Sequence, residues 1–358
     1  MRIKKALFLG TLCTAVSGMS LFAQAGVSYA KSAEKTTEAA SSEEAESEEE
    51  TSEEVTYPIT IEHAFGETVI ESKPERIATI GWENQDTPLA LGVAPVGVSA
   101  ANYGLVTDNN LHLWTDEAFA DLGVEKPVVF DDVDGLDFEQ ISDCNPDVIL
   151  AAYSGMTQED YDTLSQIAPV IPYKEKAWQT SWREQTIENA EGMGMKPEGE
   201  KKVKEVEELI AEKLEEYPQL EGIPTAFCWI SADDFSTFYV YLPTDPRAAY
   251  LLDLGFTLPE SVQKLAGETD DFNITVSREN ADQLDDIQLM VVYGDEDLLK
   301  SLQEDKLMSQ IPAIKNGAVA LVDSTSALAG ACTPSILSIP YEIDEYLQLL
   351  SDAAENIK

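Results

Sequence analysis

The sequence predicts an α/β fold of two α/β lobes with mainly parallel central sheets, bridged by a single long helix. Short apolar runs alternate with helical segments in both halves of the 358-residue chain, as they do in parallel α/β sheets. A helical stretch at 181–217 interrupts this alternation once. On either side of it the same unit occurs, FEQISDCNPDVILAAY at 138–153 and RENADQLDDIQLMVVY at 278–293. The repeat indicates that both lobes contain one equivalent helix–turn–strand element.

Residues 1–30 are predicted to be a secretory signal peptide. MRIKK is basic, ALFLGTLCTAVSGMSLFA is apolar, and small residues allow cleavage after Ala25 or Ala30. A transmembrane anchor is the weaker interpretation, because Gly, Ser and Thr interrupt the apolar run and no charged flank follows. Residues 31–56 carry ten glutamates and no aromatic residue, so we expect a disordered acidic tether there.

The N-terminal lobe is predicted over residues 57–172. It opens with a β-hairpin in YPITIEHAFGETVIES, and IATIG then forms a strand. A helix follows, with Asp86 or Thr87 as its N-cap and Pro88 in its first turn. The remaining elements are strands in APVGVSA and PVVF, the unit 138–153, and a loop, helix and strand in YSGMTQEDYDTLSQIAPVIPY.

An inter-lobe helical segment is predicted at 173–218. SWREQTIENAEGMG is one helix, and a second runs from Pro197 to Pro218 with apolar residues at helical spacing. This second helix is about 30 Å long, enough to connect two lobes. The C-terminal lobe is predicted over 219–358, with strands in IPTAFCWIS, FSTFYVYLP and AVALVD, helices in DPRAAYLLDLGF and IPYEIDEYLQLLSDAAENI, and the unit 278–293.

Composition excludes several classes of function. The net charge of −44 argues against nucleic acid and anionic membrane surfaces as partners, since both require Lys/Arg patches. The chain lacks GxSxG, P-loop, GxGxxG and HExxH motifs, so we expect no enzyme, no catalytic residue and no cofactor. His63 and His112 are its two histidines and are expected to be ordinary polar surface. A site for a bare metal ion is therefore not expected.

The cysteines do not form a recognisable framework. Cys144, Cys228 and Cys332 are far apart and show no CxxC spacing, which argues against a zinc ribbon and a disulfide scaffold. Three buried or half-buried thiols are expected. The alternative is that two of them form a disulfide.

Several stretches resemble a known family of transport proteins. In order, KPERIATIGWENQDTPLALGVAPVGV, TSWREQTIENAEGMG, YLPTDPRAAYLLDLGF and IPAIKNGAVALVDS are similar to the iron–siderophore substrate-binding proteins of ABC importers, the clan of the vitamin B12-binding protein. The resemblance covers residue 57 to the C-terminus. It implies a class III binding-protein fold, a ligand held between the lobes, and delivery to an ABC permease dimer with its ATPase. It also implies an exported monomer, at the cell surface or in the periplasm.

Ligand contacts are expected where loops leave the carboxyl ends of the parallel strands. Aromatic faces and Arg side chains there suit a bulky, partly apolar chelate with exposed oxygens. The candidates are Trp82, Asn84, Tyr103, Tyr153, Ser154, Trp178, Trp182, Arg183, Trp229, Tyr239, Tyr241 and Arg247. Core packing is the alternative for the aromatic residues. For Arg183 the alternative is a surface pair with Glu184 or Glu188, and for Arg247 a pair within its lobe or a role at the helix start beside Pro246.

The expected ligand is a ferric siderophore. An acidic body with few cations near the cleft favours a neutral or weakly charged chelate, such as a hydroxamate, over a triply anionic catecholate. Cobalamin or haem is the alternative ligand within the clan. A surface ligand sensor is the alternative from another class of protein.

Glu139 and Glu279 occupy the same offset in the two repeated units, fourteen residues before Tyr153 and Tyr293. The family resemblance implies that one acidic residue on each lobe docks on an Arg of the permease. The alternative is that each Glu only favours the first turn of its helix through the helix dipole.

Membrane anchoring depends on Cys13. Related proteins carry a lipobox that ends in Cys, but here Gly-Thr-Leu precedes Cys13, which is a poor match and lies early in the apolar run. We expect a secreted form without a lipid, and the alternative is an atypical lipid site at Cys13.

Overall fold

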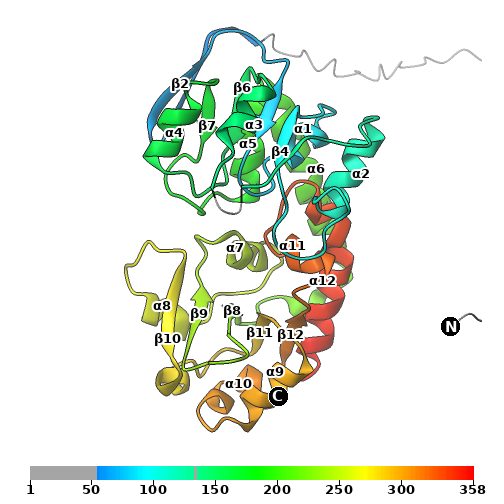
Figure 1. Cartoon of the computed structure of the whole chain (residues 1–358). Helices are drawn as coiled ribbons and strands as arrows, with labels where there is room; N and C mark the ends of the chain where they lie inside the picture. The colour runs from blue at the N-terminus through cyan, green and yellow to red at the C-terminus, as the bar shows by residue number, and fades with distance from the viewer. Residues whose placement is uncertain (1–54, 133–134) are drawn as a thin grey trace, which may run out of the picture. The chain divides into compact units, whose positions relative to one another are not determined.

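The computed structural model describes residues 55–132 and 135–358, and residues 52–358 form one compact unit (Figure 1). Within this unit two lobes lie one above the other, each built around its own five-stranded sheet. The predicted signal peptide, residues 31–54 of the predicted tether and Cys13 lie outside the described residues.

The sheet of the N-terminal lobe has the strand order β5-β4-β3-β6-β7, and every pairing in it is parallel. Its strands are β3 (Ile77–Thr79), β4 (Gly97–Ser99), β5 (Val129–Phe130), β6 (Val148–Ala151) and β7 (Val170–Pro172). The helices between them are α1 (Asp86–Ala90), α2 (Leu113–Asp121), α3 (Phe138–Asp143) and α4 (Gln158–Leu164). Every residue of β3 and β6 is buried, and all but Thr79 are apolar, as expected for a parallel sheet covered on both sides.

A β-hairpin opens the lobe, as predicted. Its strands β1 (Ile59–His63) and β2 (Gly66–Ile70) pair antiparallel. The expectation that His63 is polar surface is wrong, because its ring is buried against the lobe. Nε2 of His63 lies 2.9 Å from Thr68 Oγ1, which itself donates to the carbonyl of Val170. Burial lowers the pKa of His63, so the neutral ring is favoured.

Two helices separate the sheets, α5 (Trp182–Gly192) and α6 (Lys196–Leu214), and a short 3₁₀ turn, η1 (Pro218–Leu220), follows. The predicted long helix is therefore present. Val203, Val206 and Ile210 form its buried stripe, and α6 packs on α5 and on the C-terminal helix. The first sheet ends at Pro172 and the second begins at Thr225, on either side of the predicted inter-lobe segment.

The C-terminal lobe has the strand order β10-β9-β8-β11-β12. Its strands are β8 (Thr225–Trp229), β9 (Thr237–Tyr241), β10 (Asn273–Ser277), β11 (Leu289–Tyr293) and β12 (Val319–Val322). Its helices are α7 (Pro246–Asp253), α8 (Glu260–Ala266), η2 (Arg278–Gln283), α9 (Glu296–Glu304), η3 (Met308–Gln310), α10 (Pro312–Asn316), α11 (Ala327–Ala331) and α12 (Ser338–Ala354).

The second sheet is mixed rather than mainly parallel. β8, β11 and β12 are parallel, but β9 pairs antiparallel with both β8 and β10. A short loop joins β8 directly to β9, and a connection without a crossover helix leads to antiparallel pairing. The α/β class and the two lobes are as predicted, and the exception is this antiparallel edge.

The repeated sixteen-residue units form equivalent elements. Each begins with a helical turn whose first backbone N–H groups are capped by a side chain, Asp137 in one lobe and Ser277 in the other. Each continues into an inner strand of its sheet, β6 or β11. The copies differ because the first helix is α-helical and the second is a 3₁₀ helix.

After β12 the chain returns to the N-terminal lobe. The backbone N–H of Leu105 donates to the carbonyl of Ser326 at 2.9 Å, and Ser335 Oγ donates to Asp86. α12 then runs along the outer side of the C-terminal lobe and pairs with α6 through Lys213 and Asp344 (Figure 1). A second, non-covalent connection therefore joins the lobes, which the sequence did not predict.

Cys144, Cys228 and Cys332 are buried free thiols. Within residues 55–132 and 135–358, no helix is long and apolar enough to cross a membrane. Among these same residues, no group of three or more His, Cys, Asp or Glu side chains is arranged to hold a metal ion.

Candidate ligand site between the lobes

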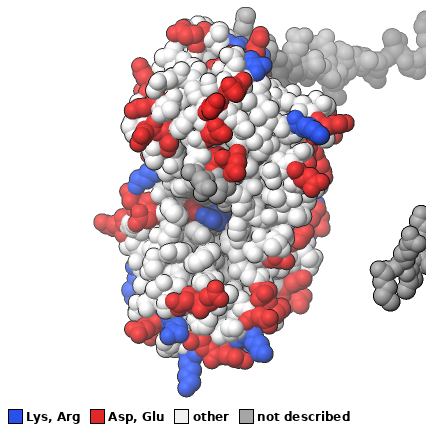
Figure 2. Space-filling model, viewed as in Figure 1, with Lys and Arg blue, Asp and Glu red and all other residues white. Residues whose placement is uncertain are grey.

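A pocket of about 510 Å³ lies between the lobes, within the size range of small-molecule sites. Figure 2 shows a hollow at mid-height of the molecule, with basic atoms visible inside it. The N-terminal lobe provides most of the lining, from the loops that follow the five strands of its sheet and from α4, and the C-terminal lobe provides two residues. The lining residues are Ile80, Gly81, Trp82, Asn102, Asp132, Gly135, Leu136, Tyr153, Ser154, Gly155, Met156, Asp160, Trp178, Arg247 and Phe272.

Three predicted aromatic residues form one wall of this pocket. The rings of Trp82 and Trp178 meet edge to face with centroids 6.4 Å apart, and those of Tyr153 and Trp178 do so at 5.3 Å. Trp178 has a φ of +62°, and its backbone N–H donates to the carbonyl of Ser154. Ring contacts and a backbone hydrogen bond therefore hold the wall in place.

Asn84 supports this wall from behind and does not line the pocket. It is fully buried, and its Nδ2 donates to the carbonyls of Ile80 and Tyr153. Its Oδ1 accepts from the Tyr153 N–H and from Asn189 on α5. The amide thus joins the loops after β3 and β6, and the structure gives it a structural role in place of the predicted ligand contact.

Arg247 is the basic residue among those that line the pocket. Its Nε and Nη2 donate to the two carboxylate oxygens of Asp245 at 2.8 and 2.6 Å, and its guanidinium lies 4.0 Å from the ring centroid of Tyr241. Burial opposes the charge, but the hydrogen bonds and the negative charge of Asp245 outweigh it and hold the pKa of Arg247 well above its ordinary value. The cation is therefore permanent and already neutralised by its buried partner.

Two further carboxyl groups line the pocket. Ser99 Oγ donates to Asp132, and Asp160 belongs to the capping box of α4. Burial raises the pKa of Asp132, although the bond from Ser99 opposes the shift. With Arg247 paired to Asp245, the charged groups around the pocket give no excess of positive charge.

Tyr103 lies beside the pocket at the junction of the lobes. It lines a narrow recess together with Trp82 and Asn102, and its ring meets that of Tyr293 edge to face at 5.2 Å. Burial, with smaller contributions from neighbouring groups, raises the pKa of Tyr103 to about 12. Its phenol is therefore neutral near pH 7.

Trp229 and Tyr239 stack on each other with centroids 5.5 Å apart, and each is 40% exposed. Neither is among the residues that line the pocket. The structure therefore places this predicted pair outside the pocket, on an open face of the second sheet.

Trp182 and Arg183 connect elements instead of facing the pocket. Trp182 Nε1 donates to Asp253 at 3.0 Å, and Arg183 Nη1 donates to the same carboxylate at 2.7 Å. Arg183 Nε also donates to Glu207 on α6. Neither residue lines the pocket, and among the described residues the alternative for Arg183, a pair with Glu184 or Glu188, is not formed. Trp182 and Arg183 brace α5 against α6 and α7.

Asp132 and Phe272 line the pocket and were missed by the sequence reasoning. Asp132 follows the predicted strand PVVF, so the rule that ligands meet strand ends would have found it. Phe272 directly precedes β10, a strand that was not predicted.

Glu139 and Glu279 are both exposed, one on each lobe, in the first turns of α3 and η2. Within the part of the chain that the structure describes, neither forms an ion pair. Leu136, three residues before Glu139, lines the pocket, so the start of α3 lies near its edge. Their role in docking stays a prediction.

The lobes also touch next to Trp178. Lys176 forms an ion pair with Asp270, and Gln179 Nε2 donates to the carbonyl of Asp270 at 3.0 Å. These contacts and those of Tyr103 lie on the two lobes' facing surfaces, so the pocket is part of a larger junction.

Comparison with known proteins identifies the family. Residues 77–325 match the periplasmic binding protein family, which is more than half of the chain. The chain belongs to this family. The periplasmic binding protein described here is therefore a solute-binding protein and not an enzyme.

The similarity to PiaA of Streptococcus pneumoniae TIGR4 extends over the described fold. The structure of PiaA in complex with ferrichrome shares 48% sequence identity and a TM-score of 0.81, and the match covers 84% of this chain and 100% of that chain. Two proteins of Bacillus subtilis (strain 168) are more distant. The putative ABC transporter substrate-binding lipoprotein YhfQ is 25% identical, with 75% of this chain and 81% of YhfQ covered. The petrobactin-binding protein YclQ is 24% identical, with 81% of this chain and 88% of YclQ covered.

Proposed function

We propose that this periplasmic binding protein captures a ferric hydroxamate siderophore in the pocket between its lobes and delivers it to an ABC permease. The observation that carries the proposal is an aromatic-walled pocket with one charge-compensated arginine. The 48% identity to PiaA, whose crystal structure contains ferrichrome, supports the same class of ligand.

The charge of the pocket favours a neutral chelate. A triply anionic ferric catecholate needs several unpaired cations to replace its water shell. Arg247 shares its charge with Asp245, and Asp132 and Asp160 add negative groups. A ferric trihydroxamate has no net charge, and its carbonyl oxygens accept hydrogen bonds from a guanidinium.

The aromatic wall supplies contact area for the apolar parts of the ligand. Trp82, Tyr153 and Trp178 present large, rigid faces at a low cost in conformational entropy. Hydrogen bonds to the backbone hold the loops that carry them, which limits the ordering that binding requires.

The family works outside the cytoplasmic membrane, and we infer the same for this chain. The proposal also holds that residues 1–30 direct export of the protein and that the protein binds its ligand as a monomer. Glu139 and Glu279 are proposed to dock on the permease, supported by their exposure and their equivalent places in the two lobes. We propose a secreted form without a lipid. Mass spectrometry of the mature N-terminus tests this, and a diacylglyceryl group on Cys13 would show attachment to the membrane instead.

A titration of tryptophan fluorescence tests the ligand class. The mature protein is titrated with ferric ferrichrome, a ferric catecholate, a ferric carboxylate chelate, haem and cobalamin. Ferric ferrichrome is expected to bind most tightly. Trp178→Ala is expected to lose about 1–3 kcal/mol of binding free energy, as for other aromatic contacts. Trp229→Ala is the matched control, because this exposed indole lies outside the pocket lining. Equal losses in both variants would contradict the assignment of the site.

A further inference from the structure

The lobes are joined in different ways on the two sides of their junction. Figure 1 shows α11 and α12 on one side, and the segment that leads from α8 into β10 on the other. The first side is buried, whereas the second is an exposed bridge between two loops. This difference indicates on which side the lobes can part.

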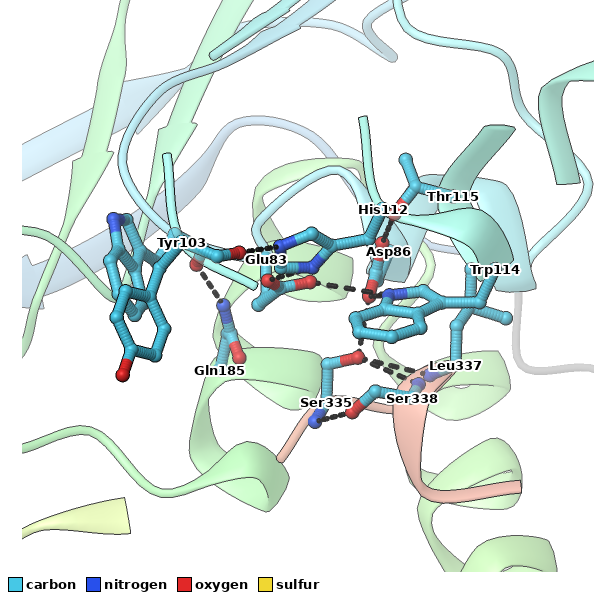
Figure 3. Close-up of polar contacts among 11 residues, drawn as sticks. Glu83, Asp86, Tyr103, His112, Trp114, Thr115, Gln185, Ser335, Leu337 and Ser338 are labelled. Carbon is cyan, nitrogen blue, oxygen red and sulfur yellow. Dashed lines mark hydrogen bonds and ion pairs between the residues drawn. The ribbon is translucent and has the colours of Figure 1, made fainter. Parts of the chain in front are cut away.

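The buried side is centred on Asp86 of α1, which is fully buried (Figure 3). Its carboxylate accepts hydrogen bonds from Trp114 Nε1 at 2.9 Å and from Thr115 Oγ1 at 2.8 Å, both on α2 of the same lobe. Ser335 Oγ donates to this carboxylate from the segment that returns from the C-terminal lobe. Separating the lobes here would remove one donor from a buried carboxylate, which costs more than breaking an exposed hydrogen bond. The contact therefore favours a side that stays closed.

His112, at the N-cap of α2, also belongs to the buried side. Its ring is 5% exposed, so the expectation that His112 is polar surface is wrong. Nε2 lies 3.0 Å from the backbone carbonyl oxygen of Tyr103. The ring packs on Gly330 of α11, where an added Cβ would lie 2.7 Å from Cε1 of His112. The lobes are in close contact here, and this side can serve as a hinge.

A polar bridge lies on the other side, where the loops at 174–180 and 267–272 meet. Lys176 forms an ion pair with Asp270, and the two side chains are 45% and 80% exposed. Gln179 Nε2 donates to the backbone carbonyl of Asp270 at 3.0 Å. Each exposed contact of this kind favours the closed arrangement only weakly, because water competes for the same groups. The bridge can therefore break and re-form without disturbing the core of either lobe.

Each half of the bridge is held by its own lobe. The backbone N–H of Trp178 donates to the carbonyl of Ser154 at 3.2 Å, and the N–H of Leu242 donates to the carbonyl of Phe272 at 2.9 Å. Trp178 and Phe272 both line the pocket, one from each lobe. Gln179 directly follows Trp178 in the sequence, so the bridge sets the separation between these two parts of the pocket lining.

We propose that Lys176, Gln179 and Asp270 form a latch that holds the two lobes closed over the bound ligand, and that ligand release depends on its opening about the buried side. The proposal rests on the proposed function, because it concerns exchange of the same ligand. Among the described residues, the pocket lining does not include these three. They are positioning residues, which act on the ligand through Trp178 and Phe272.

Reversing one charge of the latch tests the proposal. Lys176→Glu places two carboxylates where the ion pair was, and is expected to raise the release rate of ferric ferrichrome by about 2- to 10-fold. Stopped-flow tryptophan fluorescence at low salt measures this rate. Lys176→Glu with Asp270→Lys should restore the wild-type rate, because the ion pair can form again with its charges exchanged. An unchanged rate in Lys176→Glu, or no restoration in the exchanged pair, would overturn the proposal.

The matched control is Lys174→Glu, at an exposed lysine of the same loop. It changes the net charge by the same amount and should release the ligand at the wild-type rate. Gln179→Ala removes the other contact and should raise the release rate by about 2- to 10-fold. An equal rate increase in Lys174→Glu and Lys176→Glu would mean that overall charge, and not the latch, controls release.

A measurement without ligand separates the latch from the proposed function. Nitroxide labels are attached through Glu175→Cys and Glu268→Cys, two exposed positions beside Lys176 and Asp270. The native cysteines of the described chain are buried, so they do not compete for the label. Pulsed electron paramagnetic resonance should show one short distance between the labels, and Lys176→Glu should add a population at longer distances that the exchanged pair removes.

The two outcomes are distinct. If the longer distances appear in Lys176→Glu but no ferric chelate binds, the proposed function fails and the latch stands as a contact that holds the lobes together. If Lys176→Glu leaves the distance distribution unchanged, the latch is overturned whether or not a chelate binds.

Discussion

The indole of Trp178 packs directly on Gly155, so closely that a β-carbon at position 155 would lie 2.5 Å from its Nε1. Gly155→Ala is therefore expected to push the indole away from Tyr153 and disturb the aromatic wall. We predict a loss of about tenfold in affinity for ferric ferrichrome, or about 1.4 kcal/mol. Fluorescence titration measures this loss. If Gly155→Ala binds ferric ferrichrome as tightly as the wild type while Trp178→Ala binds it more weakly, the prediction is wrong. The aromatic wall then tolerates displacement of the indole.

Arg247 and Asp245 form a buried ion pair at the pocket, so removing one partner affects stability as well as binding. Arg247→Ala leaves Asp245 buried without its cation and is expected to cost about 3–5 kcal/mol of folding free energy, the usual range for a broken buried pair. Urea unfolding measures this cost.

The paired variant Asp245→Asn with Arg247→Gln separates the two effects. It removes both charges, so most of the stability should return while affinity for the chelate stays low. Recovery of affinity together with stability would mean that Arg247 supports the fold and does not contact the ligand.

Glu139 and Glu279 are exposed first-turn glutamates without an ion-pair partner among the described residues. The double variant Glu139→Ala, Glu279→Ala is expected to keep its stability and its affinity, because exposed charges contribute little to either. Uptake of radioactive iron chelate through the cognate permease should fall, since charged partners speed association and stabilise docking.

The matched control for this pair is Glu159→Ala with Glu296→Ala. These exposed glutamates also occupy first turns, of α4 in one lobe and α9 in the other. The docking role would be contradicted if Glu139→Ala with Glu279→Ala showed normal uptake, or if the control pair lowered uptake equally. The repeated units would then be equivalent in structure only.

Ser335 connects the returning C-terminal segment to Asp86 on the N-terminal lobe. Ser335→Ala removes one of three donors to a buried carboxylate and is predicted to cost about 1–3 kcal/mol of stability. Ser301→Ala, at an exposed hydroxyl on α9, is expected to be nearly neutral. Equal stability of the two variants would mean that this second connection between the lobes contributes little.

The sequence predicted the fold class, the long helix and the repeated units because these depend on local patterns. Continuous apolar runs identified β6 and β11, and strand ends led to Trp82, Tyr153 and Arg247. The antiparallel β10 was missed, since its residues NITVS are half-buried at a sheet edge and lack a strong apolar run. Phe272, next to it, was missed with it.

Residue type alone did not separate ligand contacts from internal partners. Arg183 meets Asp253, which is 70 residues away in the sequence, and Asn84 bonds Asn189 at a separation of 105. His112 was expected at the surface because a single histidine carries no pattern that indicates burial. These partners are set by tertiary packing, which no local spacing records.

The central claim is that the pocket between the lobes binds one neutral ferric hydroxamate. Isothermal titration calorimetry of the mature protein at pH 7 tests it most directly, with ferric ferrichrome compared against a triply anionic ferric catecholate. The account predicts one molecule of ferric ferrichrome bound per chain, with weaker binding of the catecholate and further weakening in Trp178→Ala. Tighter binding of the catecholate, or no binding of ferric ferrichrome, would contradict it.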